Sequence, residues 1–277
     1  MAQGNINGFD QDFYLDGYAI SGVQSLDGGY SVQSDQSTFL GNKGRVMPFQ
    51  TSPSIGQFSV SKDMTSQPSG ITKWLGEEGF SGLFKYGEKS LAFQSGFMTE
   101  YRASFSPDDL PQEQFSLSVF GEMGGDFSVG ELKSKNETKF IPSSSGIEIE
   151  CKGRETNRVT NFQYGVRVIR DAHYGIGSKF PKQVNLTLPY EISLNLTLEV
   201  DDYESENVYT TIRDGIDLTG INIKISDKCD SSKNIEYKIE DASIVSESIA
   251  GNYNDQVTVN LQYKAFSMNV PEINYNV

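Results

Sequence analysis

Apolar and polar residues alternate along much of this chain, and this alternation predicts β-strands with one buried face. In the longest run, every even-numbered residue from 184 to 200 is apolar, while the odd-numbered residues are mostly polar. A strand gathers such residues on one face, whereas a helix would spread them around its axis. Pro189 cannot donate a hydrogen bond to a ladder, so it predicts two strands or one strand bent at this residue.

Shorter alternating runs occur in both halves of the chain, whereas helical patterns are confined to the segments 69–78 and 205–214. Each of these two segments begins with a Ser, which is a favourable helix N-cap. We therefore expect an all-β fold with two short helices. The shorter strand runs lie at 58–60, 115–119, 221–225, 235–239 and 257–263.

The two halves of the chain share a layout, which predicts a tandem duplication. Four segments of the first half each have a counterpart in the second half, 134 to 143 positions later. The pairs of starting residues are Gly22 and Gly165 (offset 143), Phe58 and Ile192 (134), Met98 and Ile239 (141), and Phe115 and Val257 (142). The alternative is a chance similarity between β patterns, because few residues are identical. The periodicity fades over 124–145, where Gly, Lys and Ser are dense. We therefore predict one β-domain over 1–135 and a second over 136–277.

A long segment of the first half, residues 33–56, shows no clear periodicity and carries four large apolar side chains. Loops of this length in a compact domain are usually functional or disordered, and the apolar residues argue against simple disorder. Exposed apolar groups on a loop suit an arm that packs on a neighbouring molecule. The residues expected to make this contact are Phe39, Leu40, Met47 and Phe49.

Composition and charge narrow the class of protein. The net charge of −14 argues against a surface that grips nucleic acid, since phosphates would be repelled. Two cysteines, Cys151 and Cys229, are too few for a disulfide framework, so we expect free thiols in a reducing compartment. The first residues lack the pattern of a signal peptide, and no apolar run approaches the roughly 18 residues of a membrane helix.

Candidate catalytic and metal-binding residues are few. His173 lies in a pattern typical of a turn or strand end, and no Gly-x-Ser-x-Gly elbow is present to give it a nucleophile. Asp10, Asp12 and Asp16 depart from the order of a calcium loop at Tyr14. A second acidic cluster over 201–206 precedes a predicted helix, whose N-terminus it would complement. We therefore predict no catalytic residue, no cofactor and no metal site.

Two segments resemble those of tail tube proteins from long-tailed phages. Residues 17–32, GYAISGVQSLDGGYSV, resemble the opening of that domain, with a strand, a short turn and a second strand. Residues 235–266, IEYKIEDASIVSESIAGNYNDQVTVNLQYKAF, resemble its end. There a strand carries Ser-Glu-Ser, a polar turn ends in Asn-Asp, and the last strand alternates Val, Val, Leu and Tyr. The resemblance covers most of the chain, once per copy, and its motifs include no catalytic group.

The resemblance implies a non-enzymatic virion protein of the phage tail, assembled in the host bacterial cytoplasm. It implies two tandem β-sandwich or barrel domains, each with one short flanking helix and a long inter-ring loop. Domains of this family join edge to edge into rings whose inner wall is a continuous β-barrel, and the rings stack into the conduit for the genome. The commonest members have one domain per chain and form hexamers, so a tandem version would form a pseudo-hexameric ring from three chains.

The expected partners are other copies of the chain, the tape measure, terminator and baseplate proteins, and genome DNA that passes through the lumen without specific binding. No membrane partner is expected. An acidic lumen would repel DNA phosphates, so we predict a net negative bore. The alternatives are a head–tail connector, tail terminator or baseplate component of related fold, a carbohydrate-binding β-module with clustered aromatic residues, and an enzyme.

Overall fold

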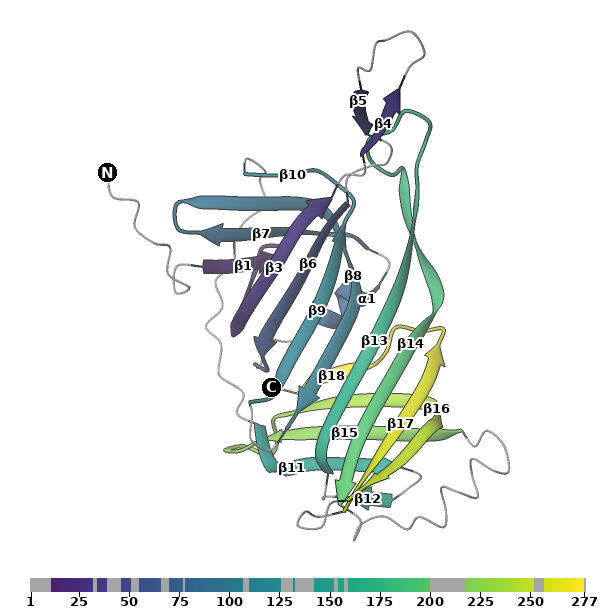
Figure 1. The fold of residues 1–277 in the computed structure, drawn as a ribbon. Coiled ribbons are helices and arrows are strands. Elements are labelled where there is room, and N and C mark those ends of the chain that lie inside the picture. Colours follow the sequence, from purple (N-terminus) through teal and green to yellow (C-terminus); the bar gives the residue numbers. More distant parts are fainter. Residues whose placement is uncertain are drawn as a thin grey trace.

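The computed structural model describes residues 11–31, 34–38, 46–50, 55–65, 70–76, 78–106, 110–125, 132, 142–151, 154–156, 159–199, 218–251 and 257–276. These residues are almost entirely β-strand, as the alternation predicts, and the strands pair antiparallel (Figure 1). The helix α1 (Gly70–Leu75) confirms the helical pattern at 69–78. The second predicted helix, 205–214, lies outside the described residues.

The strands divide between the two halves of the chain. In the first half they are β1 (Gln11–Leu15), β2 (Tyr18–Ile20), β3 (Val23–Ser31), β4 (Ser34–Thr38), β5 (Val46–Gln50), β6 (Ile55–Asp63), β7 (Phe80–Tyr86), β8 (Lys89–Phe105), β9 (Gln112–Val119) and β10 (Met123–Gly124). In the second half they are β11 (Pro142–Cys151), β12 (Arg154–Thr156), β13 (Val159–His173), β14 (Gln183–Glu199), β15 (Thr219–Asp227), β16 (Asn234–Ala250), β17 (Thr258–Ser267) and β18 (Ile273–Asn276).

The backbone of the fold is one continuous sheet, which we call the central ladder, in the order β3-β6-β9-β8-β13-β14-β17-β16. The two halves meet inside it at the internal joint, where β8 pairs with β13 from Phe105↔Phe162 to Glu100↔Arg167. Two smaller groups of strands run across the ladder strands in Figure 1. One comprises β2, β1, β7 and β10, and the other comprises β12, β11, β15 and β18.

Two long strands connect the ladder with these smaller groups by changing partner along their length. In β8, residues 89–96 pair with β7 and residues 96–104 pair with β9. In β16, residues 234–242 pair with β15 and residues 243–250 pair with β17. The change of partner follows a residue with a positive φ, Ser95 at 57° in β8 and Asp241 at 52° in β16. Such a local irregularity lets a strand bend from one layer into the next.

The strand pairings of the second half follow the same order as those of the first. The first half pairs as β2-β1-β7-β8-β9-β6-β3, and the second pairs as β12-β11-β15-β16-β17-β14-β13. The register irregularities recur as well. The β8–β9 ladder shifts after Met98, and the β16–β17 ladder shifts after Ile244. These two residues are 146 positions apart, as are Ser95 and Asp241.

The alternating residues account for the two faces of the central ladder. The described part of the run from 184 to 200 lies in a single strand, β14, whose pairing with β13 shifts register between Thr187 and Glu191, around Pro189, as expected of one bent strand. Its even-numbered residues Tyr190, Ile192, Leu194, Leu196 and Leu198 are buried in one apolar core that extends through both halves. The opposite face of the ladder is polar and carries many Ser, Thr, Asn and Gln side chains.

The segment 33–56 differs from the loop without regular structure that its sequence predicts. It contains a two-stranded hairpin, β4–β5, with pairs from Ser34↔Gln50 to Thr38↔Val46, and it includes the start of β6. The sequence did not predict this hairpin, because its residues lack the alternation of apolar and polar positions by which the other strands were recognised. In Figure 1 the hairpin projects from one end of the molecule.

Candidate functional site

The titratable residues noted in the sequence do not converge in the described part of the chain. There, no three His, Cys, Asp or Glu side chains gather as they would around a metal ion. His173 is half-exposed at the end of β13, with its Nε2 atom 3.6 Å from the Asp171 carboxylate. Cys229 is an exposed free thiol. No helix within the described ranges is long and apolar enough to cross a membrane.

The acidic residues near the N-terminus have structural partners. Asp16 lies in the turn between β1 and β2 with φ of 50°, and its Oδ1 accepts a hydrogen bond from the Ser81 backbone N–H at 3.1 Å. Its Oδ2 lies 3.2 Å from Lys73 Nζ, at the end of α1. Asp16 therefore fixes the turn against β7 and α1. Asp10 and the acidic cluster 201–206 lie outside the described residues.

The most distinctive surfaces are the two open edges of the central ladder. Among the described residues, β3 pairs only with β6, and residues 243–250 of β16 pair only with β17. Both edges are largely exposed, and large side chains stand on them: Tyr30 on β3 is 71% exposed and Ile249 on β16 is 57% exposed. An open edge presents unpaired N–H and C=O groups, which are a template for another strand. These edges are therefore candidate assembly surfaces.

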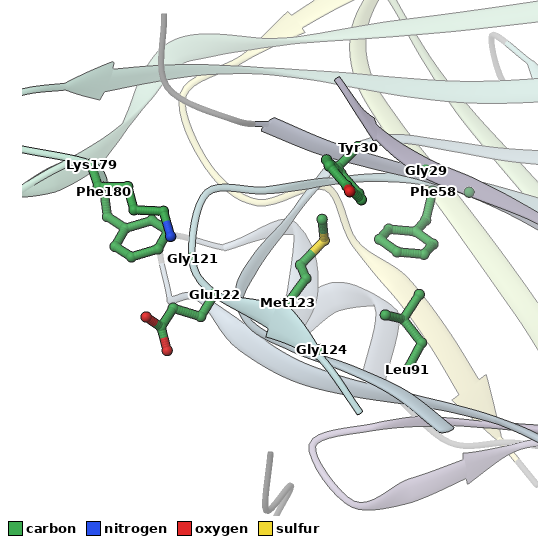
Figure 2. A pocket seen from close by; sticks show the side chains of 11 residues that line it. Gly29, Tyr30, Phe58, Leu91, Gly121, Glu122, Met123, Gly124, Lys179 and Phe180 are labelled. Carbon is green, nitrogen blue, oxygen red and sulfur yellow. The ribbon is translucent and has the colours of Figure 1, made fainter. Parts of the chain in front are cut away.

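A hollow of about 650 Å³, which we call the edge hollow, lies against β3. In Figure 2, Tyr30 and Met123 lie between Phe58 and Leu91 on one side and Lys179 and Phe180 on the other. Gly28 is essential to this shape, because a Cβ there would approach the Phe58 ring to 2.1 Å. The hollow is lined by Gly28, Gly29, Tyr30, Phe58, Leu91, Gly121, Glu122, Met123, Gly124, Lys179 and Phe180.

At the internal joint, the corresponding space is filled by a buried polar cluster. Glu113 on β9 is fully buried, and its Oε2 lies 2.9 Å from Lys62 Nζ. Its Oε1 accepts hydrogen bonds from the hydroxyls of Tyr101 at 3.0 Å and Tyr275 at 2.6 Å. Because Tyr101 donates to Glu113, the Tyr237 hydroxyl 3.2 Å away is left to donate to Tyr101. The cluster joins β6, β8 and β9 of the first half to β16 and β18 of the second.

The phenols of this cluster remain protonated donors over a wide pH range. Burial, reinforced by the charge of Glu113, raises the pKa of Tyr101, Tyr237 and Tyr275 well above the ordinary value. Burial also raises the pKa of Tyr164, whose ring lies 4.9 Å from that of Tyr237. The three hydroxyls therefore keep their protons, and can donate hydrogen bonds, around neutral pH.

The helix α1 ties the two halves together next to this cluster. Its last carbonyl groups need hydrogen-bond donors, and Arg170 of β13 donates to the carbonyls of Leu75 at 3.0 Å and Gly76 at 2.7 Å. Tyr190 of β14 also donates to Leu75 O, at 3.3 Å. A cation near a helix C-terminus is electrostatically favourable. These bonds, with the internal joint, hold the two halves in one fixed arrangement.

Two hairpins project from the same end of the molecule in Figure 1, β4–β5 and the outer part of β13–β14. Of the four residues predicted to make an inter-ring contact, Phe39 and Leu40 lie outside the described residues. Met47 and Phe49 lie on β5, opposite Ser37 and Asp35. The sequence did not single out the apolar residues of the second hairpin, which are exposed: Ile169, Tyr174, Ile176 and Leu188.

The polar face of the ladder is close to electrically balanced. Its described charges include the pairs Arg102–Glu100 at 2.6 Å and Arg167–Glu191 at 3.7 Å. The same strand rows also carry Asp27, Asp63, Glu199 and Lys264, which pair in the ladder with the polar residues Ser59, Gln112, Thr258 and Ser193 respectively. The acidic excess of this face is therefore small beside the net charge of −14.

Comparison with known proteins adds no identification: no family model matches the chain, and no curated protein matches it.

Proposed function

We propose that this chain is a tandem duplication of one β-domain, that it self-assembles into rings, and that the rings stack into the tube of a phage tail. The observation that carries this proposal is the match between the internal joint and the two open edges. Within the chain, β8 of the first half pairs with β13 of the second. Their counterparts, β16 and β3, are the two end strands of the central ladder among the described residues.

Three features support the duplication. The strand pairings recur in the same order. The long strands β8 and β16 both have 17 residues and both bend after a residue with positive φ. Both also shift register against the following strand, after Met98 and Ile244. Independent folds would have no reason to share irregularities at matching positions, because bulges are local features set by particular residues.

A ring follows from the same geometry. If every contact between neighbouring domains has the same geometry, each domain is related to the next by the same rotation. Such a repeated contact closes into a ring when a whole number of these rotations makes 360°. Open sheet edges expose a monomer to unwanted strand pairing, and closure of the ring pairs these edges with each other. Three chains would supply six domains, and hence the pseudo-hexameric ring that the resemblance to tail tube proteins implies.

A tube requires a second contact, between rings, and a bore suited to DNA. The projecting hairpins offer the contact between rings, because they leave the ladder at one end and expose apolar side chains such as Ile176. The polar face of the ladder offers the lining of the bore. It would place hydroxyl and amide groups and a small excess of acidic charge toward the DNA, and without clustered Lys or Arg it gives phosphates no strong grip. The proposed partners are therefore the chain itself, the other tail proteins and the passing genome in the virion.

Deleting residues 36–50, which removes all of β5 and most of β4, should leave rings that no longer stack. The hairpin pairs only within itself in the described part of the chain, so its loss should leave the core intact. Negative-stain electron microscopy should show separate rings for the deletion variant and tubes for the full chain. Circular dichroism of both proteins is the control for folding. Tubes of normal length from the variant would refute the role of this hairpin.

A further inference from the structure

We infer that the second half of β16 in one copy pairs antiparallel with β3 of a second copy, in the register of the internal joint, and that Ile249 of the first copy fills the edge hollow of the second. This inference rests on the proposed self-assembly and adds to it the partner strand, the register and the residues in contact.

The register expected between copies follows from matching three strand pairings of the first half with their counterparts in the second half. On β9 and β17, Leu117 and Tyr263 occupy matching positions, because they pair with Met98 and Ile244. Leu117 pairs with Phe58, which pairs with Gly28. Tyr263 pairs with Leu194, which pairs with Tyr164. Gly28 is therefore the counterpart of Tyr164 on the strand that enters the joint.

The internal joint then predicts the contacts between copies. Ala103 pairs with Tyr164 there, and Tyr101 pairs with Val166. The counterpart of Ala103, 146 positions later, is Ile249, and the counterpart of Tyr101 is Glu247. The expected pairs between copies are therefore Ile249 with Gly28 and Glu247 with Tyr30. On the polar face, the pair Arg102 with Gly165 becomes Ser248 with Gly29.

The side chains at the expected pairs are complementary in size. In the internal joint the small Ala103 stands opposite the large Tyr164, whereas between copies the large Ile249 would stand opposite Gly28. Ile249 pairs with the buried Val259 in its own chain, so its side chain lies on the core face of the ladder. On that face of β3 lies the edge hollow, with Phe58, Leu91 and Met123 in its wall. An apolar side chain 57% exposed would thus enter an apolar hollow.

The second pair is complementary in hydrogen bonding. Glu247 Oε1 is buried and has no hydrogen-bond partner among the described residues. Tyr30, the residue expected opposite it, is 71% exposed and carries a phenol that can donate to a carboxylate. A buried carboxylate oxygen is costly unless it is bonded. Within the chain, a tyrosine of one half meets the same need for a buried glutamate of the other half, since Tyr275 donates to Glu113 Oε1 at 2.6 Å.

Disulfide crosslinking tests the register directly. The test protein carries Gly29→Cys and Ser248→Cys, with the native thiols removed as Cys151→Ala and Cys229→Ser. A Cβ at Gly29 meets nothing within 4 Å, and Ser248 is exposed, so both changes should be tolerated. Opposite residues of an antiparallel pair are about 4.5–5.5 Å apart, within reach of a disulfide. Mild oxidation should give covalent dimers and trimers on a non-reducing gel.

The matched control replaces Ser248→Cys by Ser246→Cys, two residues along the same face. Its distance to residue 29 would be about 7–8 Å, beyond the reach of a disulfide. We expect at least about tenfold less crosslinking from this control. Equal crosslinking from both proteins, or none from either, would overturn the inferred register. If tubes form but residues 29 and 248 do not crosslink, the inferred register is wrong while the proposed tube stands. If rings crosslink through these residues but no tubes form, the register is supported and the proposed tube is contradicted.

Discussion

Replacing Ile249 by Asp should leave a folded monomer that no longer forms rings. Ile249 is exposed in the single chain, so the change should cost the fold little. In the ring, the carboxylate would enter the apolar edge hollow of the next copy without a cation to pair with, at a cost of several kcal/mol per contact. A loss of about 3 kcal/mol already weakens association more than about 100-fold. Mass photometry should therefore find the 30.7 kDa chain alone.

The control for this prediction is Leu110→Asp. Leu110 is 64% exposed in the turn between β8 and β9, which are interior strands of the ladder. The same charge at this position should leave the mass of the ring unchanged. Rings of normal mass from the Ile249→Asp protein would show that β16 is not a ring contact.

Replacing Glu113 by Ala should destabilise the chain by about 3–5 kcal/mol, the range seen when one partner of a buried ion pair is removed. Lys62, whose side chain is only 4% exposed, would lose its carboxylate partner, and the hydroxyls of Tyr101 and Tyr275 would lose their acceptor. The free energy of unfolding, measured in urea on the isolated chain, should show the loss.

Two further variants separate the charge from simple loss of packing. Glu100→Ala removes a carboxylate from a pair that is partly exposed to solvent, so it should change the free energy of unfolding by no more than about 1 kcal/mol. The double variant Lys62→Met with Glu113→Leu removes both buried charges and should recover much of the stability lost in Glu113→Ala. A Glu113→Ala protein within about 1 kcal/mol of the parent would mean that Lys62 finds another partner or solvent.

The regular part of this fold could be predicted from the sequence because buried strands repeat every second residue. The alternation over 184–199 forms most of β14. The register shift of this strand against β13 lies around Pro189, which has no backbone N–H to donate to the ladder. The helix at 70–75 follows from its N-cap and its apolar spacing, with Ile71, Trp74 and Leu75 buried. In each case one local pattern carries the whole signal, so no knowledge of distant partners is required.

The alignment of the two halves was harder to predict, because alternating patterns match one another at every shift of two residues. The sequence aligned Phe115 with Val257, whereas the pairing registers favour Leu261, four positions further along. The shift keeps the side chain on the same face, so hydrophobicity alone does not distinguish the two. The registers at the bulges do, because one irregularity interrupts the β8–β9 ladder and one interrupts the β16–β17 ladder.

The assembly surfaces and the buried cluster could not be predicted for a different reason: they depend on which strands become neighbours. Lys62 and Glu113 are 51 positions apart and look like ordinary charged residues within alternating runs. Gly28 and Gly29 did carry a signal, since glycine inside a strand often marks a close approach by another group. That signal identifies the place but not the partner, which only the open edge of the ladder indicates.

The most direct test of ring assembly is negative-stain electron microscopy of the purified chain at high concentration, with mass photometry on the same sample. We predict hollow tubes, or rings of about 92 kDa, three times the 30.7 kDa chain. A uniform population of 30.7 kDa monomers, without rings at any concentration, would contradict both the ring and the tube.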